Sequence, residues 1–389
     1  MKKVCWLMCA WFLVSACDDE LVFPRIGPQD LPRVDDITVP DGFIVEEFAS
    51  NIELPTGIAF PPDGSDRLFV NELQSGKIWI YEEGERLDTP FYDLALNIQG
   101  GFPVSGENGM IGLEFDPDYV NNGYLYITYA SRNENTIGTV ARITDRNNSG
   151  EEFTVLLTDL PSDRGHQIEN ARFGPDGKLY VSVGDAYQEQ YVQDPERAHG
   201  KILRMNPDGT IPADNPFGPD NYVYAIGFRN AFDMLFLDNG DLLATDNGPT
   251  GMDKMMVVEA GGNYGWPDEL GFNDNPEFTN PIHVWTETVS PTGMVKTRGS
   301  QFPAAYRNKV YQVLFGFTFS SGPNTNGKRV QIAELSGQGQ NTTVTFTDFA
   351  VWQFEGTPNN PVDIAEGPDG SLYVSDIFQG KIFRIRHAP

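Results

Sequence analysis

Residues 165–185 read GHQIENARFGPDGKLYVSVGD, and the fold prediction starts from this stretch. Two apolar and aromatic runs flank a Pro-Asp-Gly turn, which predicts a β-hairpin over residues 173–183. His166 precedes the first strand and Asp185 follows the second. Because a hairpin brings its outer ends together, we expect the imidazole and the carboxylate to be neighbours, as a general base requires. A surface histidine beside a surface aspartate is the alternative interpretation.

The same succession of apolar run, turn and aromatic strand recurs along the chain. The copies lie at 57–70, 112–127, 173–183, 234–244 and 362–374. They are roughly 55 to 65 residues apart, with one wider gap that a diverged copy at 306–319 would fill. Repeats of this length in an all-β chain predict a six-bladed β-propeller with one four-stranded blade per repeat. A pair of β-sandwiches or a β-helix fits the spacing less well.

The segment at 43–48 precedes the first copy and is expected to close the ring by adding a strand to the last blade. The composition agrees with many short strands joined by turns, since the 389 residues include 40 Gly and 28 Pro. We therefore expect one propeller domain over residues 41–389. The formal net charge of −28 repels phosphate backbones, so nucleic acid is not expected as a partner.

The N-terminus reads as a targeting segment. Lys2 and Lys3 precede an apolar run at 4–14, and the sequence LVSAC at 13–17 resembles a bacterial lipobox. Residues 1–17 are thus predicted to be a lipoprotein signal peptide, with Cys17 as the lipidated residue; an ordinary secretory signal is the alternative. Residues 18–40 are predicted to be a flexible tether. The expected location is the bacterial cell envelope, anchored to the membrane and facing the periplasm or the exterior.

Polar residues fall at the same edge of successive repeats, where the loops of a propeller meet at one end of the channel. Glu107 stands before the second repeat, His166 and Gln167 before the third, and Arg229 and Asn230 before the fourth. The expected location of a small-molecule site is therefore this end of the channel.

Several of these segments carry a family resemblance. They are GENGMIG at 106–112, the hairpin at 165–185, GKILRMNPDGTIP at 200–212, GFRN at 227–230 and GGNYGWP at 261–267. In this order they resemble the soluble glucose/sorbosone dehydrogenases, which are six-bladed propeller quinoproteins that use pyrroloquinoline quinone (PQQ) and calcium. The likeness covers nearly all of residues 41–389. It implies oxidation of a sugar or another polyol-like alcohol, with electrons passed to an external cytochrome or quinone.

The resemblance also implies roles for individual residues. His166 would be the general base, Asp185 would hold its tautomer, and Arg229 would stabilise the reduced quinone oxygen. The other cofactor contacts implied are Glu107, Gln167, Arg229, Asn230 and Thr292. The main-chain carbonyls of Gly248 and Pro249 would bind calcium, a hard cation that prefers oxygen ligands. The GGNYGWP segment is expected to form a structural turn with a buried Trp266.

The chain also departs from the family pattern. Phe228 replaces a typical histidine, and Lys254 replaces an acid expected beside Asp253 in a second calcium site. The basic clamp for the three cofactor carboxylates is hard to find; Lys328 could supply its lysine if residues 317–327 are an insertion. Two alternatives to a sugar dehydrogenase therefore stay open. One is a non-catalytic, glycan-binding propeller lipoprotein that has lost the clamp, and the other is a lactonase-like hydrolase with a metal in the channel.

Overall fold

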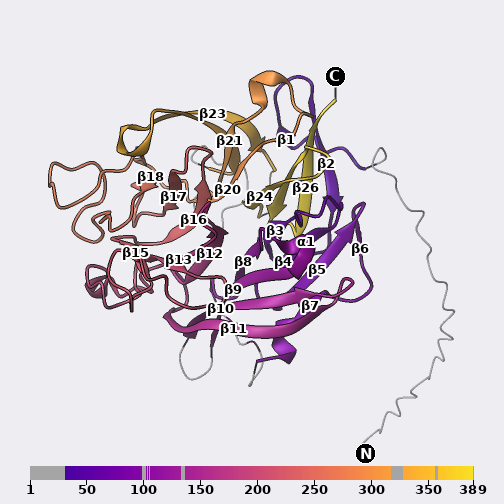
Figure 1. Ribbon diagram of the computed structural model, residues 1–389. Helices are drawn as coiled ribbons and strands as arrows, with labels where there is room; N and C mark the ends of the chain where they lie inside the picture. The colour runs from indigo at the N-terminus through magenta and orange to yellow at the C-terminus, as the bar shows by residue number, and fades with distance from the viewer. Residues whose placement is uncertain are drawn as a thin grey trace, which may run out of the picture.

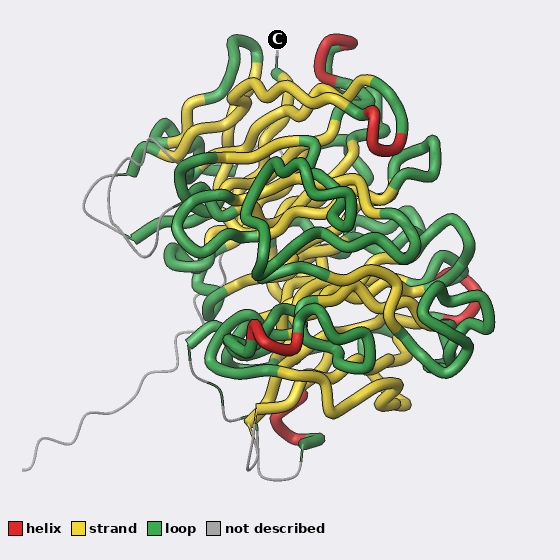
Figure 2. Tube along the Cα trace, turned by 90° about the vertical axis from the view of Figure 1, so that its left-hand side faces the viewer, coloured by secondary structure: helices red, strands yellow, loops and turns green. Residues whose placement is uncertain are grey.

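The computed structural model describes residues 31–98, 102, 104, 106–132, 136–316, 327–354 and 358–388. Six sheets surround a central axis, and the short helical segments lie in loops (Figures 1 and 2). The predicted six-bladed β-propeller is confirmed. The predicted signal peptide, with Cys17, and residues 18–30 of the predicted tether lie outside the described residues. No helix in the described part of the chain is long and apolar enough to cross a membrane.

The first strand of each blade is the innermost one. These strands are β3 (Pro55–Ala59), β8 (Met110–Phe115), β12 (Ile168–Phe173), β16 (Ala231–Phe236), β20 (Pro291–Lys296) and β24 (Pro361–Glu366). Each of them contacts the innermost strand of the next blade, and β24 contacts β3. The ring of blades is thereby closed around a central axis (Figure 1).

The outer strands follow antiparallel in chain order. The first two blades continue with β4 (Leu68–Glu72), β5 (Lys77–Glu82), β6 (Glu85–Arg86) and β7 (Tyr92–Asp93), and with β9 (Tyr124–Arg132), β10 (Thr136–Asp145) and β11 (Gly150–Pro161). The next two continue with β13 (Leu179–Val183), β14 (Lys201–Met205) and β15 (Val223–Ile226), and with β17 (Leu242–Asp246), β18 (Asp253–Val258) and β19 (His283–Trp285). The last two continue with β21 (Val310–Leu314), β22 (Arg329–Ser336) and β23 (Thr343–Trp352), and with β25 (Leu372–Asp376) and β26 (Lys381–His387).

The helical segments are single turns. They are α1 (Tyr119–Asn122) and the 3-10 turns Leu94–Leu96, Glu189–Tyr191, Ala304–Tyr306 and Gly339–Asn341. The diverged repeat expected at 306–319 corresponds to the fifth blade. Its second strand, β21, lies in that range, whereas its innermost strand, β20, begins earlier.

The ring closes as predicted, through a strand from the N-terminal side. Strand β2 (Phe43–Ala49) pairs with β26, with Val45 opposite Ile385. Strand β1 (Ile37–Thr38) pairs with β23 and extends the fifth blade. The folded part therefore begins before the predicted boundary at residue 41, because β1 covers the edge of β23 and satisfies hydrogen-bonding groups that would otherwise be exposed.

The apolar core lies between neighbouring blades. At the closure, the ring of Phe43 packs edge-on against Phe302 and Phe349, with centroids 4.9 and 5.1 Å apart. Strand β13, in the middle of its blade, is buried along its whole length. Apolar side chains fill the space between neighbouring blades. The polar side chains that face the channel therefore come from loops and from the innermost strands.

Candidate active site

The hairpin of the third blade brings the predicted histidine and aspartate together. Strands β12 and β13 pair antiparallel, and the turn between them places Gly177 at a φ of 69°. Nδ1 of His166 and Oδ1 of Asp185 lie 2.7 Å apart, and the two residues are only 6% and 2% exposed. The surface-pair alternative is therefore wrong, because both side chains are buried.

The backbone around this pair lies in an unusual conformation. His166, Ala186 and Tyr187 have φ values of 51°, 50° and 56°, in the left-handed region that costs non-glycine residues about 1–3 kcal/mol each. A Cβ on Gly184 would lie 2.5 Å from the carbonyl carbon of His166, so only glycine permits this approach of the two segments. Strained residues that the surrounding structure holds in place are typical of functional sites.

Asp185 is held from several sides. Its Oδ2 accepts a hydrogen bond from Nε1 of Trp266 at 3.0 Å, and its Oδ1 accepts one from the backbone N–H of Tyr187 at 2.9 Å. Because a carboxylate accepts hydrogen bonds, it fixes the tautomer with a proton on Nδ1 of His166 and leaves Nε2 able to take another. Trp266 is buried as expected. Sequence reasoning missed its contact with Asp185, since a turn motif does not show what its side chain touches.

Arg229 lies next to this pair, in the loop that leads into β16. Its backbone carbonyl accepts a hydrogen bond from the N–H of Asp185 at 2.8 Å. Its guanidinium lies 5.7 Å from the ring of Trp266. The structure therefore brings His166, Asp185 and Arg229 to the same end of the ring, with Trp266 touching both Asp185 and Arg229.

Asp246 at the end of β17 sets the backbone of the Arg-Asn pair. Its Oδ1 accepts hydrogen bonds from the N–H groups of Arg229 and Asn230 at 3.0 and 2.7 Å. Its Oδ2 lies 3.2 Å from Nζ of Lys254, and both side chains are buried. Lys254, which replaces an expected acid in the sequence pattern, thus neutralises a carboxylate of the fourth blade.

The predicted calcium ligands have a different partner here. Nη1 of Arg229 donates to the carbonyl oxygens of Asn247 and Gly248 at 2.9 and 3.0 Å, and Pro249 is exposed. A calcium ion bound to the carbonyl oxygen of Gly248 would lie next to this guanidinium, and the two positive charges would repel each other. The site as arranged therefore does not fit calcium. The described residues also include no group of three or more His, Cys, Asp or Glu placed to hold a metal.

Both carboxylate oxygens of Asp253 already accept hydrogen bonds from the protein. Its carboxylate accepts hydrogen bonds from the backbone N–H groups of Gly248, Val289 and Ser290 at 2.7–2.8 Å. These bonds connect the fourth blade to the segment before the fifth. The carboxylate acts as a structural anchor in this arrangement.

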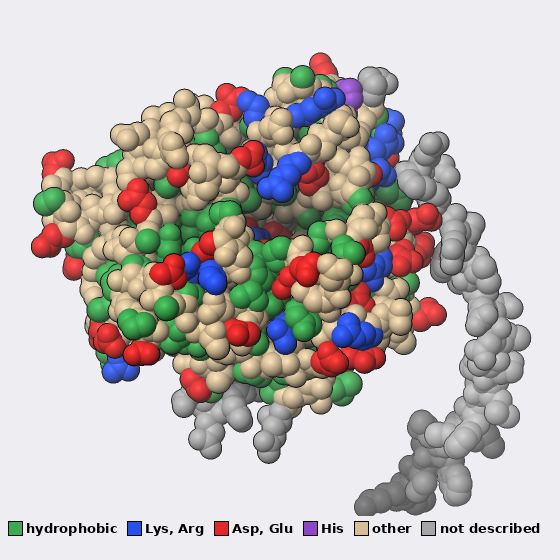
Figure 3. Space-filling view, in the orientation of Figure 1, with side chains coloured by type: hydrophobic (Ala, Val, Ile, Leu, Met, Phe, Trp, Pro, Cys, Tyr) green, Lys and Arg blue, Asp and Glu red, His purple; other side chains and the backbone are tan. Residues whose placement is uncertain are grey.

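A cavity of about 270 Å³ opens at this end of the channel and is lined by residues from all six blades. Four of the predicted cofactor contacts line it, namely Glu107, Gln167, Asn230 and Thr292. The space-filling view shows a hollow near the middle of the ring (Figure 3). The tertiary structure therefore brings these four predicted contacts, each from a different blade, to the same cavity.

The cavity carries buried polar atoms without a partner in the protein. They are Oε1 of Gln167, Oε2 of Glu169, Oδ1 of Asn230, Oδ1 of Asn247 and Oγ1 of Thr292. Leaving a buried polar group unpaired costs about 1–3 kcal/mol, so such a lining indicates a polar ligand. Oγ1 of Thr292, and Oε2 of Glu169 in its protonated form, can donate to the oxygens of a flat, oxygen-rich cofactor such as PQQ, whereas the three amide oxygens can only accept hydrogen bonds.

The charges near the cavity are mainly acidic. Burial and the neighbouring Glu107 raise the pKa of Glu169 well above its usual value, which favours its protonated form. No Lys or Arg lines the cavity within the described ranges. Lys328 is fully buried outside this lining, where desolvation lowers its pKa although Asp376 opposes that effect. The predicted contact between Lys328 and a cofactor is not part of the observed cavity.

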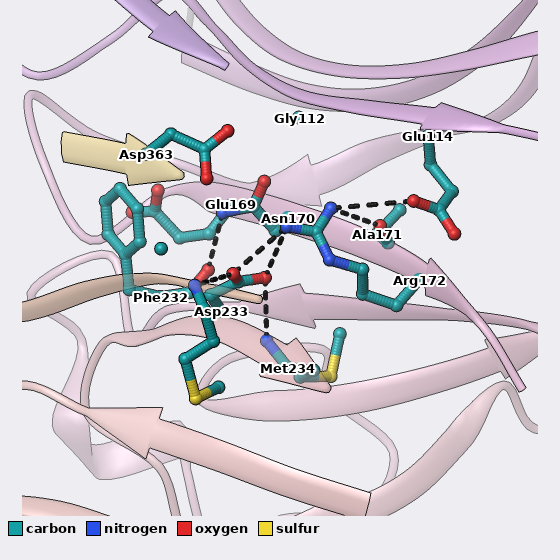
Figure 4. Close-up of polar contacts among 12 residues, drawn as sticks. Gly112, Glu114, Glu169, Asn170, Ala171, Arg172, Phe232, Asp233, Met234 and Asp363 are labelled. Atoms are coloured by element: carbon teal, nitrogen blue, oxygen red, sulfur yellow. Dashed lines mark hydrogen bonds and ion pairs between the residues drawn. The ribbon is translucent and has the colours of Figure 1, made fainter. Parts of the chain in front are cut away.

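A second polar cluster connects innermost strands from four blades (Figure 4). Nη2 of Arg172 lies 2.8 Å from Oδ1 of Asp233, and its Nη1 lies 3.7 Å from Oε2 of Glu114. Asp233 also accepts a hydrogen bond from the N–H of Met294, at 2.8 Å. In the same way, Asp363 accepts one from Ile58 at 2.9 Å. These contacts therefore join the second blade to the third, the third to the fourth, the fourth to the fifth and the sixth to the first.

The profile of a family described as Glucose / Sorbosone dehydrogenase matches residues 52–384. The quinoprotein glucose dehydrogenase B of Acinetobacter calcoaceticus is 31% identical over 266 residues, which cover 60% of this chain and 54% of that protein. The aldose sugar dehydrogenase YliI of Escherichia coli is 24% identical and covers 88% of this chain and 92% of that protein. Human Hedgehog-interacting protein is 30% identical over 45% of this chain and 28% of its own length.

Solved structures agree with the fold. An oxidoreductase (glucose dehydrogenase) of Thermus thermophilus superposes with a TM-score of 0.73 at 25% identity, covering 88% of this chain and 99% of that one. The PQQ-bound aldose sugar dehydrogenase of Streptomyces coelicolor gives 0.70 at 23%, covering 90% and 99%. The family match extends over most of the propeller and includes the hairpin, the Arg-Asn pair and the turn with Trp266. The chain belongs to the glucose/sorbosone dehydrogenase family.

Proposed function

We propose that the protein oxidises a sugar or another polyol-like alcohol with PQQ as its cofactor and passes the electrons to an external cytochrome or quinone. The observation that carries the proposal is the buried pair of His166 and Asp185, whose neighbour Gln167 lines a cavity with unpaired polar atoms. PQQ, when bound, supplies a quinone that accepts the hydride of the alcohol carbon. The similarity to sugar dehydrogenases supports the same class of reaction.

The residues of this chain would handle the proton. Asp185 holds the proton on Nδ1 of His166, so that Nε2 takes the proton of the substrate hydroxyl. The hydrogen bond from Trp266 and the backbone N–H of Tyr187 keep the carboxylate in place during that transfer. The positive charge of Arg229, which lies 5.7 Å from the ring of Trp266, would favour negative charge on a reduced oxygen brought near it.

The cavity residues would hold the cofactor. Thr292 would donate its hydroxyl hydrogen to an oxygen of the cofactor, while the unpaired amide oxygens of Gln167, Asn230 and Asn247 would accept from a donor such as its ring N–H. Calcium would reach the carbonyl of Gly248 only after Arg229 has moved away from it.

The proposed place of action is the bacterial envelope. The lipobox-like sequence at 13–17 supports a lipid anchor at Cys17, with the propeller facing the periplasm or the exterior. Metabolic labelling with a fatty acid tests this directly. We expect incorporation into the wild-type protein and none into Cys17→Ala; equal labelling of both would contradict the anchor.

A second function, binding of glycans without turnover, is favoured by one observation. Within the described part of the chain the central cavity contains two carboxyl groups, Glu107 and Glu169, and no Lys or Arg. A cofactor with three carboxylates gains most from charge-assisted hydrogen bonds, and this lining supplies none from Lys or Arg.

The deciding experiment reconstitutes the mature protein with PQQ and calcium and follows dye reduction with a panel of sugars. We expect turnover in the wild type, loss of turnover in His166→Ala, and unchanged cofactor binding in that variant by equilibrium dialysis. Undiminished turnover in His166→Ala would rule out its role as the base. Absence of cofactor binding in the wild type would favour the glycan-binding function.

A further inference from the structure

An open groove of about 960 Å³ lies beside the proposed base, separate from the central cavity. One wall comes from the facing strands of the second blade, with Ile137 at the start of β10 and Leu160 at the end of β11. The opposite wall comes from the loop between β13 and β14, at residues 188 and 196–199. The groove therefore crosses the junction between the second and third blades.

Three buried polar atoms of this groove lack a partner in the protein. They are Oδ1 of Asn108, Oγ of Ser162 and Nδ1 of His199, and Asn108 is only 1% exposed. Desolvation, together with the charges of Lys201 and Arg197, lowers the pKa of His199 to about 4. At neutral pH its ring is therefore uncharged, with one nitrogen that donates and one that accepts. A lining of this kind suits a ligand that can both donate and accept hydrogen bonds.

The groove lies next to the candidate active site. Asn108 lines the groove, whereas its neighbour Glu107 lines the central cavity. The exposed ring of Tyr187 lies between the guanidinium of Arg164, 5.7 Å away, and the ring of His166, whose centroid is 4.2 Å away. An aromatic ring that is 49% exposed thus connects the base with the groove.

The chemistry of the lining indicates an uncharged ligand. Two arginines, at 164 and 197, face three carboxylates, at 159, 163 and 196, so that neither sign dominates. Leu160 and Pro161 add apolar surface. A chain of sugar units matches this mixture, because each hydroxyl both donates and accepts and each ring has an apolar face that can pack on the surface of Leu160 and Pro161.

The wall at 196–199 is held in place before any ligand arrives. Nζ of the buried Lys201 donates to the carbonyl oxygens of Val192 and His199, the latter at 2.6 Å. A wall ordered in advance lowers the entropy cost of binding.

We propose that this groove binds further units of a neutral oligosaccharide, so that the unit beside His166 is the end of a chain. That the end unit reacts at His166 rests on the proposed sugar oxidation. Binding of the other units in the groove does not require turnover. It identifies the substrate class as neutral oligosaccharides in preference to free monosaccharides or acidic sugars.

The test measures binding by calorimetry on the full protein without cofactor, with malto-, cello-, xylo- and mannotetraose and the corresponding monosaccharides. We expect at least one tetraose to bind at least tenfold more tightly than its monosaccharide. Asn108→Ala and His199→Ala should lower that ratio at least fivefold. If either variant does not fold, Arg197→Ala replaces it and should lower the same ratio. The exposed Arg146→Ala, outside the groove, is the matched control and should keep the ratio.

The outcomes separate the two proposals. Equal affinity for every tetraose and its monosaccharide, or groove variants with the wild-type ratio, would overturn the groove proposal. Tight tetraose binding without dye reduction after reconstitution would uphold the groove and reject the oxidation. Dye reduction whose kcat/KM is independent of chain length would count against the groove while upholding the oxidation.

Discussion

The indole N–H of Trp266 donates to Oδ2 of Asp185 at 3.0 Å, although the two residues are 81 positions apart in the chain. The other oxygen of Asp185 lies 2.7 Å from Nδ1 of His166. The loop after β18 in the fourth blade therefore positions a histidine–aspartate pair of the third blade. The orientation of the proposed base depends on how two blades are joined, and this makes Trp266 a positioning residue.

Trp266→Phe tests that role. The substitution keeps the aromatic ring but leaves a buried oxygen of Asp185 unpaired, which costs about 1–3 kcal/mol, so we expect kcat to fall about tenfold with KM little changed. Dye-reduction kinetics of the reconstituted protein give both constants. Trp79→Phe is the matched control, because Nε1 of Trp79 has no hydrogen-bond partner. Equal kcat values for both variants would contradict the positioning role.

Arg229→Met tests the competition between a guanidinium and calcium. Removing the positive charge 3.0 Å from the carbonyl of Gly248 should strengthen calcium binding to the cofactor-free protein at least tenfold, since two such charges repel by about 2 kcal/mol even in water. Calorimetric titration with calcium measures this change. Arg204→Met, which removes an arginine from the third blade, is the control. Unchanged or weaker calcium binding in Arg229→Met would show that the guanidinium does not compete.

Asp363→Asn tests the pH dependence of stability. Burial raises the pKa of Asp363 to about 7, whereas Arg172 opposes that shift. A raised folded-state pKa contributes stability below the ordinary value near 4, and this contribution is lost as the pH rises through about 7. The free energy of unfolding of the wild type should therefore fall between pH 5 and 8. In the variant, urea titrations should show a smaller fall, by about 1.4 kcal/mol or more.

The exposed Asp35→Asn controls for the general effect of removing a negative charge. It should keep the wild-type slope of stability against pH. The same slope in Asp363→Asn would mean that Asp363 does not titrate in this range.

Lys201→Met gives the opposite pH dependence. Desolvation lowers the pKa of Lys201 to about 7 in the folded state, so the unfolded chain binds more protons from pH 7 to about 10.5. Stability should therefore rise with pH over this range in the wild type and less in the variant. Urea unfolding at pH 7 and 9.5 measures the difference. Lys309→Met, whose ammonium pairs with Glu334 at the surface, should behave as the wild type does.

The same variant should loosen the loop that Lys201 holds. Without the two hydrogen bonds to Val192 and His199, limited proteolysis should cut more rapidly within residues 191–199. Cleavage at the wild-type rate would show that the loop is held by its other contacts.

The features predicted correctly from the sequence are those encoded by neighbouring residues. The turn between β12 and β13 joins strands only a few residues apart, so the approach of His166 and Asp185 follows from one hairpin. The repeats, the number of blades and the closing strand follow from the same local pattern. The predicted tether boundary failed because the pairing of β1 with β23 joins two segments far apart in the chain.

The sequence by itself determined the propeller, its closure and the local histidine–aspartate pair, because turns and strand alternation act over short separations. Only the tertiary structure decided that Trp266 donates a hydrogen bond to Asp185 and that Arg229 donates one to the carbonyl of Gly248. It alone also decided that a separate groove opens near Tyr187, whose ring lies next to Arg164. The physical reason is that these contacts form between blades. Their geometry depends on how six sheets pack around one axis, which no single segment encodes.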